Sequence, residues 1–184
     1  MLPAAVVFRT SERSIIDYYK AVADAAGDLP FFVYNLPQLT QVEFFPAMME
    51  KLAREIPTLK GLKHSAPDFS QIRAFADMGL TCFSGNGAFP LPALNMGAVG
   101  TIDAPPSLAP WHYAELFTAW EAGDSKRAQS LQDGVRKFVD LARTWVHFDI
   151  FAWTPSGRPA RPEGGECQTA RALDALIKKR YGTA

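Results

Sequence analysis

The stretches Phe31-Phe32-Val33-Tyr34-Asn35 and Leu59-Lys60-Gly61-Leu62-Lys63-His64-Ser65 decide the fold that this sequence predicts. Each contains a short apolar run, and Tyr34 and Lys63 close these runs, 29 residues apart. That interval is about the length of one strand–helix–strand repeat, the unit from which parallel sheets are built. An amine and a phenol at the ends of consecutive parallel strands would face the same edge of the sheet, where α/β folds place their chemistry.

The same alternation of strand and helix extends on both sides of these stretches. Continuous apolar runs predict buried parallel strands, at 4–8, 31–35, 59–63, 80–84 and 99–103. Helical spacing of apolar residues, bounded by Ser, Pro and Gly, predicts helices between and after them, at 12–26, 43–56, 67–78, 90–96, 107–122 and 125–148, with a last helix ending near Tyr181.

These elements predict an α/β fold with five strand–helix units and further C-terminal helices. A closed eight-stranded barrel takes about 250 residues, so the pattern corresponds to a partial TIM (β/α)8 barrel that lacks three units. We expect a single domain over 1–184, with strand–helix units in 1–122 and C-terminal helices in 123–184. An open sheet leaves its first and last strands unpaired, and natural proteins cover such edges. We therefore expect assembly with copies of the same chain or with a complementary half-barrel.

Composition excludes several classes of function. The chain has 184 residues, 19 basic and 19 acidic side chains and no basic stripe, which argues against nucleic acid as the main partner. No apolar run approaches the roughly 18 residues needed to span a membrane, and the first residues are too uncharged for a secretory signal. Cys82 and Cys167 are predicted to be free thiols in a reducing cytoplasm, Cys82 within a buried strand. His64, His112 and His147 form no zinc-type pattern, so no metal is expected.

Lys63 and Tyr34 are open to two interpretations from the residues alone. A lysine that forms a Schiff base with a keto acid, beside a tyrosine that relays protons, needs this arrangement. A strand-end lysine whose head reaches solvent, beside a half-buried strand tyrosine, gives the same pattern.

Four other groups of residues have structural interpretations that we favour over functional ones. His64 could tune Lys63, but neighbouring strand residues face opposite sides, so it is predicted to pack under the adjacent helix. The run Ser84-Gly85-Asn86-Gly87 is predicted to be a tight turn rather than a phosphate nest. The remaining two groups are aromatic residues of a core or subunit-interface helix and basic residues at a helix end: Trp111, Tyr113, Phe117 and Trp120, and Lys178-Lys179-Arg180.

Short motifs over about 130 residues occur in an order and spacing that resemble one family. They are Tyr34-Asn35-Leu36-Pro37 with Thr40, Gly61-Leu62-Lys63-His64-Ser65 with Asp68, Phe83-Ser84-Gly85, Gly97-Ala98-Val99-Gly100-Thr101-Ile102 and Ala122-Gly123-Asp124. The run from about Ser14 to Trp145 resembles the C-terminal part of the dihydrodipicolinate synthase / N-acetylneuraminate lyase family. The members of this family are class I (Schiff-base) aldolases built on a TIM barrel.

The resemblance implies roles for four residues. Lys63 would form a Schiff base with pyruvate or a related 2-keto acid, with no other cofactor, and Tyr34 would relay protons. Gly85 and Ile102 would line the substrate through their backbones. A lysine attacks a carbonyl only as the neutral amine, and the residues expected to favour that form by excluding water are Leu59, Leu62 and Phe83.

The sequence also departs from the family's pattern. The family's substrate-carboxylate loop, a Thr/Ser-Thr pair, has no counterpart here, and Ala5-Val6-Val7 replaces a frequent Pro-Tyr-Tyr. Leu39 stands where dihydrodipicolinate synthases have an arginine. Gly87 and Ala88 stand where sialic acid lyases have an acidic pair. The expected substrate is therefore another 2-keto acid, with a sugar-derived one as the preferred guess.

Two functions remain as alternatives. The first is a lyase or synthase that makes or breaks a carbon–carbon or carbon–oxygen bond next to the Schiff base. The second is a catalytically impaired family member that acts as an interaction or structural subunit. Tyr34 and Lys63 favour the first, and the absent carboxylate loop favours the second.

Overall fold

The structure is a computed structural model in which residues 2–3, 11–146, 153–154 and 164–165 are described. The chain divides into two compact units, Met1–Asp103 and Ala104–Ala184, and each is treated by itself below. None of the helices within the described ranges has the length and apolar character needed to cross a membrane.

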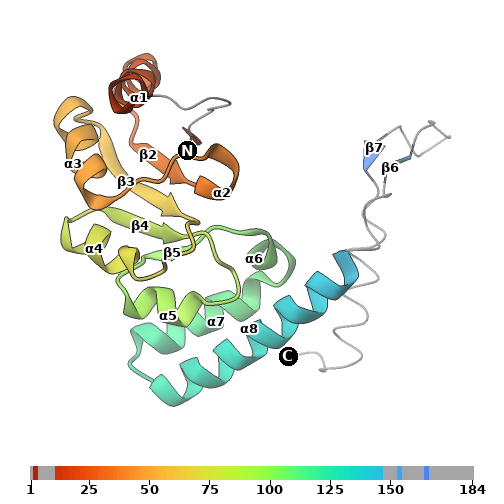
Figure 1. Cartoon of the computed structure of the whole chain (residues 1–184). Helices are drawn as coiled ribbons and strands as arrows, with labels where there is room; N and C mark the ends of the chain where they lie inside the picture. Colours follow the sequence, from red (N-terminus) through yellow and green to blue (C-terminus); the bar gives the residue numbers. More distant parts are fainter. Residues whose placement is uncertain (1, 4–10, 147–152, 155–163, 166–184) are drawn as a thin grey trace. The chain divides into compact units, whose positions relative to one another are not determined.

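The first unit contains a five-stranded sheet in which each strand lies beside its predecessor (Figure 1). All neighbouring pairs are parallel. The strands are β1 (Leu2–Pro3), β2 (Phe31–Asn35), β3 (Leu59–His64), β4 (Thr81–Ser84) and β5 (Gly100–Thr101). Parallel strands in sequential order, each followed by a helix, are the arrangement of one part of a (β/α) barrel wall.

The helices of this unit are α1 (Glu12–Ala26), α2 (Pro37–Thr40), α3 (Pro46–Glu55), α4 (Gln71–Asp77) and α5 (Pro90–Asn95). The N-terminus of α1 is capped by the Ser11 side chain, which accepts a hydrogen bond from the Ser14 amide. Its C-terminus is set by Gly27, whose φ of 63° suits glycine.

Prolines fix the start of four of the described helices. Pro37, Pro46, Pro90 and Pro110 each occupy a first helical position, where the missing N–H is not needed. A proline also drives the preceding residue out of the helical region. Phe45 (φ −91°, ψ 164°) and Ala109 (φ −137°, ψ 58°) show this effect.

One face of the sheet and the helices that cover it form the core. Figure 1 shows α3 and α4 running along the outer side of the strands. From the strands, Val33, Leu62 and Cys82 point into this core and are fully buried. The helices contribute fully buried side chains that include Tyr19, Met49, Leu52, Ile72 and Phe75, and Phe44 joins them from the segment before α3. Burial of this apolar surface is the main force that holds the unit together.

The opposite face of the same strands is only half-buried. Its side chains are those that alternate with the core residues, Phe32, Tyr34, Lys63 and Phe83. The rings of Phe32 and Phe83 lie 5.9 Å apart. Gly61 is the register partner of Phe32 on one side and of Thr81 on the other, and a Cβ atom there would come within 1.8 Å of the Thr81 carbonyl oxygen. Only glycine fits at position 61.

A bulge near the start of β3 determines which residues of this strand face the core and which face the opposite side of the sheet. Phe31 is paired with Leu59, but Phe32 is paired with Gly61, so Lys60 is the additional residue. Lys60 is exposed, whereas Leu59 lies with Phe31 in the core. From Gly61 onward the register is regular, and it places Lys63 opposite Tyr34.

The second unit contains α6 (Ala104–Leu108), α7 (Pro110–Glu121) and α8 (Ser125–Val146), and a short antiparallel pair, β6 (Trp153–Thr154) with β7 (Gly164–Gly165). Helices α7 and α8 pack against each other across a tight connection in which Gly123 has a φ of 73°. Tyr113 of α7 is buried, whereas Trp111 and Trp120 are exposed. The core interpretation of this aromatic group is therefore confirmed for Tyr113.

Several predicted elements are confirmed. The strand at 31–35 has the predicted bounds, those at 59–63 and 80–84 differ by one residue, and the break at Gly123-Asp124 is present. The predicted strand at 4–8, the helix ending near Tyr181, Cys167, His147 and the basic run at 178–180 lie outside the described residues. The single-domain expectation, with its boundary after residue 122, stays a prediction beside the division at residue 103.

Other predicted bounds are wrong for identifiable reasons. The helix predicted at 43–56 begins only at Pro46, because the Asn35 side chain holds the backbone of Phe44 outside the helix. The helix predicted from 67 begins at Gln71, because the Asp68 carboxylate accepts from the Ser70 amide and hydroxyl and forms a turn there. The helix predicted at 107–122 is divided into α6 and α7, because Pro110 forces Ala109 out of the helical region.

Candidate functional site

The four residues singled out from the sequence lie at the carboxyl ends of adjacent strands. Tyr34 and Lys63 are the next-to-last residues of β2 and β3. Gly85 directly follows β4, and Ile102 directly follows β5. Because the strands are parallel and neighbours in this order, all four positions lie on one edge of the sheet. The predicted arrangement of an amine and a phenol on consecutive parallel strands is thus confirmed.

Lys63 lies directly over the ring of Tyr34. Its Nζ atom is 4.2 Å from the ring centroid, and the two residues are register partners across β2 and β3. An ammonium at this distance from an aromatic face is attracted by the ring's quadrupole. On the other side, Lys63 is the register partner of Phe83. Aromatic residues therefore stand at the register positions on both sides of Lys63.

The predicted apolar surroundings of Lys63 need a correction. Phe83 shares its face of the sheet, as expected. Leu59 and Leu62 instead belong to the core on the opposite face. For Leu62 the reason is strand alternation, and for Leu59 it is the bulge at Lys60. Phe32, which contacts the Phe83 ring, is the second apolar residue on the lysine's side.

Gly85 leaves room for a side chain of the neighbouring strand end. A Cβ atom at this position would come within 1.8 Å of the Ser65 hydroxyl oxygen. The Gly85 amide donates to the His64 carbonyl at 2.7 Å, which continues the ladder between β3 and β4. The absence of a side chain at Gly85 thus makes the space that Ser65 occupies.

Ser65 is a candidate site residue that sequence reasoning missed. It stands two residues after Lys63, at the same edge of the sheet. Its backbone is fixed by bonds from its amide to the Asn35 carbonyl (2.9 Å) and from the Gln38 side-chain amide to its carbonyl (2.7 Å). Its hydroxyl oxygen is buried and has no hydrogen-bond partner among the described residues. Buried polar groups are ordinarily hydrogen-bonded, so this unpaired hydroxyl marks Ser65 as a candidate site residue.

The loop after β4 is a turn closed by its own side chains. The Asn86 amide donates to Ser84 Oγ, the Ala88 amide donates to Asn86 Oδ1, and the Gly87 amide donates to Asp103 Oδ2 at 2.7 Å. The Ile102 amide donates to the Ser84 carbonyl at 2.8 Å. Because protein acceptors already bind these amides, the geometry favours the tight-turn interpretation over a phosphate nest.

His64 lies on the helix-covered side, as predicted. It is 2% exposed, and its ring centroid is 5.5 Å from that of Phe75 in α4. Burial lowers the pKa of His64 below its ordinary value, and this effect outweighs the opposing influence of the Asp68 backbone and of the Glu43 and Asp68 charges. His64 is therefore a neutral, structural neighbour of Lys63.

Neither a reactive thiol nor a cluster of metal ligands is present in the part of the chain that the structure describes. Cys82 is fully buried in β4, as predicted, and burial raises the pKa of its thiol to about 12, so it is no nucleophile near neutral pH. Among the described residues, no group of three His, Cys, Asp or Glu side chains could hold a metal ion.

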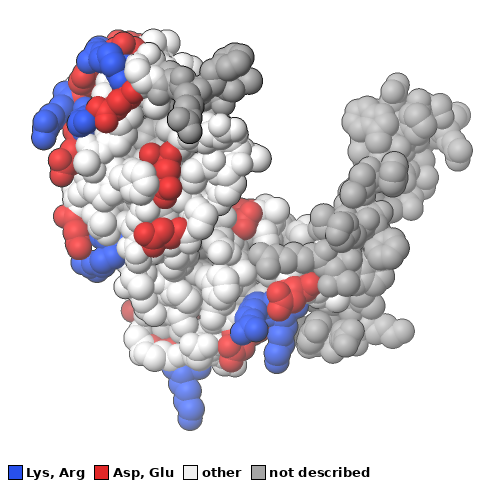
Figure 2. Space-filling model, viewed as in Figure 1, with Lys and Arg blue, Asp and Glu red and all other residues white. Residues whose placement is uncertain are grey.

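Basic and acidic side chains lie intermixed on the surface of α1 and α3 (Figure 2). Arg13 pairs with Asp17 and Glu55, and Lys51 pairs with Glu12. The residues of these ion pairs line an open pocket of about 280 Å³ between α1 and α3, so its wall carries charges of both signs.

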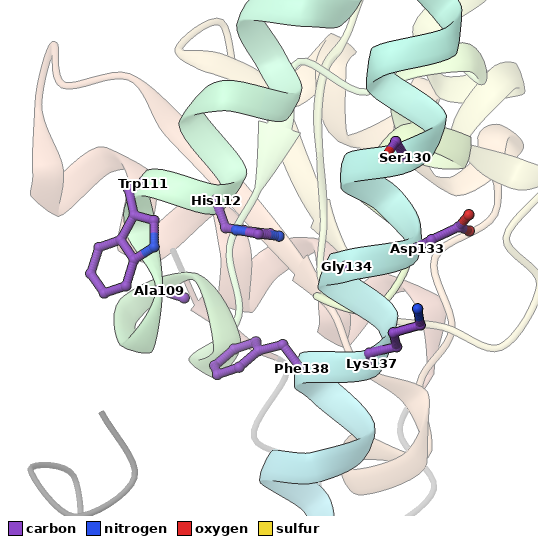
Figure 3. A pocket seen from close by; sticks show the side chains of 8 residues that line it. All are labelled: Ala109, Trp111, His112, Ser130, Asp133, Gly134, Lys137 and Phe138. Carbon is purple, nitrogen blue, oxygen red and sulfur yellow. The ribbon is translucent and has the colours of Figure 1, made fainter. Parts of the chain in front are cut away.

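A second pocket, of about 330 Å³, lies within the second unit between α7 and α8 (Figure 3). Figure 3 shows the His112 ring directed from α7 towards Gly134 of α8, where a Cβ atom would come within 2.5 Å of Nε2. Trp111 and Phe138 supply most of its apolar wall. This pocket contains none of the residues that carry the Lys63 chemistry.

The positions where the sequence departs from the family's pattern are partly described. Leu39, in α2, is 76% exposed, and Gly87 and Ala88 are buried in the turn after β4. None of these three side chains can pair with a carboxylate or bind several hydroxyls. Ala5-Val6-Val7 lies outside the described residues.

Proteins of related sequence carry one recurring name. A 4-hydroxy-tetrahydrodipicolinate synthase of Syntrophus aciditrophicus is 31% identical over 135 residues, which cover 72% of this chain and 46% of the relative. The enzyme of the same name from Sphingopyxis alaskensis is 38% identical over 128 residues, covering 68% of this chain and 43% of the relative. The chain thus spans less than half the length of these curated relatives.

Solved structures show the same fold. Dihydrodipicolinate synthase from Aquifex aeolicus superimposes with a TM-score of 0.73 at 22% identity, over 97% of this chain and 64% of that one. The sialic acid aldolase of Ruminococcus gnavus gives a TM-score of 0.71 at 21% identity, over 98% of this chain and 54% of that one. The expected α/β fold, part of a TIM barrel, is confirmed by this agreement.

A family model describes most of the chain. The model of the dihydrodipicolinate synthetase family matches residues 7–146, which include all five motifs quoted from the sequence. These residues make up well over half of the chain, so this protein is a member of the dihydrodipicolinate synthetase family.

Proposed function

We propose that this protein is a Schiff-base-forming lyase or synthase that acts on pyruvate or another 2-keto acid. The observation that carries the proposal is the placement of Lys63 Nζ 4.2 Å above the Tyr34 ring, at the carboxyl ends of two parallel strands. The names of the curated relatives support a synthase, and the sialic acid aldolase among the solved structures supports aldol chemistry. The covalent bond to Lys63 would replace any separate cofactor.

Lys63 and Tyr34 would divide the first steps between them. The neutral Lys63 nitrogen forms a bond to the ketone carbon, while the ketone oxygen takes a proton from the Tyr34 hydroxyl. Tyr34 regains a proton from the nitrogen, which leaves a neutral carbinolamine. A second proton, donated by the Tyr34 hydroxyl, releases the oxygen as water, which leaves an iminium on Lys63 and a tyrosinate at position 34. The iminium accepts the electron pair of the adjacent bond as that bond breaks, and the reverse direction forms it.

The residues around Lys63 suggest what surrounds the bound keto acid. Phe32 and Phe83 lie on the same face of the sheet as Lys63 and would supply an apolar wall beside it. The Ser65 hydroxyl offers a hydrogen bond to a polar group of the substrate. Gly85 and Ile102 would line the site through their backbones. Since Leu39, Gly87 and Ala88 bring neither a cation nor an acidic pair, we favour a different, sugar-derived 2-keto acid as the natural substrate.

Reductive trapping tests the proposal. The full chain is incubated with pyruvate and sodium borohydride, and the adduct is located by intact mass and peptide mapping. We expect a single reduced pyruvyl group on Lys63, which Lys63→Arg abolishes. The matched control is Lys60→Arg, because Lys60 is an exposed lysine of the same strand. Absence of an adduct from the folded wild-type chain would refute the proposal.

A second candidate is an interaction subunit without catalysis of its own. It is favoured by the half-exposed Phe32 and Phe83 and by β1 and β5, each of which pairs on one side only within the described residues. The partner would be a second copy or a complementary half-barrel that covers this face. Light scattering tests the assembly, and a stable monodisperse monomer would exclude it.

The unpaired, buried Cys82 fits a reducing cytoplasm, where we place the protein.

A further inference from the structure

Asn35 and His64 form a buried pair directly beneath the candidate site. They are the last residues of β2 and β3 and are register partners, one step beyond Tyr34 and Lys63. Both are almost fully buried, at 0% and 2% exposure. The Asn35 side-chain nitrogen lies 3.2 Å from His64 Nδ1. Nothing in the proposed chemistry uses either side chain.

The surroundings fix which atom donates in this pair. Asn35 Oδ1 accepts from the Phe44 amide at 3.1 Å, and Asn35 Nδ2 donates to the Phe44 carbonyl at 3.0 Å. Reversing the Asn35 amide would break both bonds, so Nδ2 must face His64. His64 Nδ1 is therefore an acceptor without a proton. The proton lies on Nε2, which donates to the Asp68 carbonyl at 2.9 Å.

The pair shares its backbone with the reactive residues. Neighbouring residues of a strand face opposite sides of the sheet. Asn35 and His64 therefore contact each other on the helix-covered face, while Tyr34 and Lys63 lie on the opposite face. A shift of β2 against β3 by one residue would exchange the faces and leave a buried amide and imidazole unbonded. The Ser65 amide, which donates to the Asn35 carbonyl at 2.9 Å, continues the same ladder.

We propose that Asn35 and His64 are positioning residues, whose cross-strand hydrogen bond sets the height of Lys63 Nζ over the Tyr34 ring. This inference rests on the proposed function for its importance to catalysis but not for its geometry. The bond requires neutral His64, because a proton on Nδ1 would face the N–H of Asn35. The charged groups that act on His64 are Glu43 and Asp68, and the Phe75 ring packs beside it.

Two variants whose new side chains are nearly isosteric with each other separate the effect of the Asn35–His64 hydrogen bond from that of packing. His64→Asn and His64→Leu both lose the Asp68 bond and the contact with Phe75, but only asparagine keeps an acceptor near the Nδ1 position. Two readouts are made on the full chain. The first is the upfield NMR shift of the Lys63 ε-methylene protons caused by the Tyr34 ring, identified by its disappearance in Tyr34→Leu. The second is the rate of pyruvate trapping with cyanoborohydride between pH 5.5 and 8.

We expect His64→Asn to keep the ring-induced shift and a trapping rate close to that of the wild type. His64→Leu should lose the shift and trap about tenfold more slowly, because the lysine is displaced from the tyrosine. In the wild type, protonation of His64 should lower the rate of pyruvate trapping as the pH falls. This part of the pH dependence should be absent from His64→Asn, and a change in packing alone would not remove it. An unchanged shift and rate in His64→Leu would overturn the inference.

The readouts keep this inference apart from the proposed function. A wild-type chain that shows the ring-induced shift but no adduct would refute the Schiff-base proposal and leave the positioning pair intact. Should His64→Leu fail to fold, nitrogen-15 spectra of wild-type His64 provide the decision without a variant. A proton on Nε2 supports the pair, and a proton on Nδ1 overturns it.

Discussion

The two faces of the same strands differ in what their side chains do. On the helix-covered face, Val33, Leu62 and Cys82 are completely buried. On the other face, one residue away along each strand, Tyr34, Lys63 and Phe83 are half-buried and form no part of the core cluster. Because strand residues alternate between the two faces, residues that stabilise the fold and residues proposed to act in catalysis are direct neighbours in sequence. Substitutions at neighbouring positions should therefore have opposite consequences.

The adjacent residues Leu62 and Lys63 offer the sharpest test of this separation. Leu62→Ala should lower the free energy of unfolding by about 2–5 kcal/mol, because it leaves a cavity in a fully buried position. Lys63→Ala should change it by less than about 1 kcal/mol while abolishing the pyruvate adduct. Urea unfolding and trapping are measured on both variants. Equal destabilisation by the two substitutions would break the comparison.

Tyr34→Phe tests the chemistry of the half-buried face alone. The ring under Lys63 Nζ is kept, and only the phenol is removed. We expect the trapping rate to fall about a hundredfold, as for loss of a general acid, with an unchanged unfolding midpoint. Tyr18→Phe, an exposed tyrosine of α1, is the matched control and should leave both quantities unaltered. A wild-type rate in Tyr34→Phe would show that the phenol relays no proton.

Acid should weaken the helix-covered face through His64. Burial holds the folded pKa of His64 below its ordinary value of 6.5, so between the two values the unfolded state binds more protons. The stability contributed by neutral His64 is complete above about pH 6.5 and is lost as the pH falls through the folded pKa. The free energy of unfolding, measured in urea for the wild type and for His64→Asn, should differ more between the two proteins at pH 7.5 than at pH 5. A difference that grows in acid would contradict the assignment.

The smallest effects are expected for two serines on opposite faces. Ser84→Ala removes the acceptor of the Asn86 amide and should cost about 1–2 kcal/mol. Ser65→Ala removes a hydroxyl with no partner among the described residues and should change stability by less than about 0.5 kcal/mol. It should instead weaken binding of a hydroxylated 2-keto acid about two- to tenfold. A stability loss in Ser65→Ala as large as in Ser84→Ala would assign both hydroxyls to the fold.

The predictable parts of the molecule are those with a local signal. The strand at 31–35 lies between Pro30 and Pro37, and α1 has its cap at Ser11 and its stop at Gly27. Tyr34 and Lys63 were found together because the strand–helix–strand interval implies one sheet edge. These features follow from residues close in sequence.

The features that were missed depend on contacts between distant residues. The bulge at Lys60 decides the face of Leu59, yet it arises from the pairing of β2 with β3. The start of α3 depends on Asn35, nine residues away from the Phe44 backbone that it binds. Ser65 gives no sequence signal, because its importance follows from the space left by Gly85. Short helices such as α2 carry too few residues to show a period.

Gly61 bears on how tolerance to substitution should be interpreted in this protein. Any side chain there would collide with the Thr81 backbone, although the position takes no part in the proposed chemistry. In a library that replaces every residue, position 61 would be depleted as strongly as position 63. Selection for soluble, folded chain would separate the two, since it would remove variants of Gly61 and retain variants of Lys63.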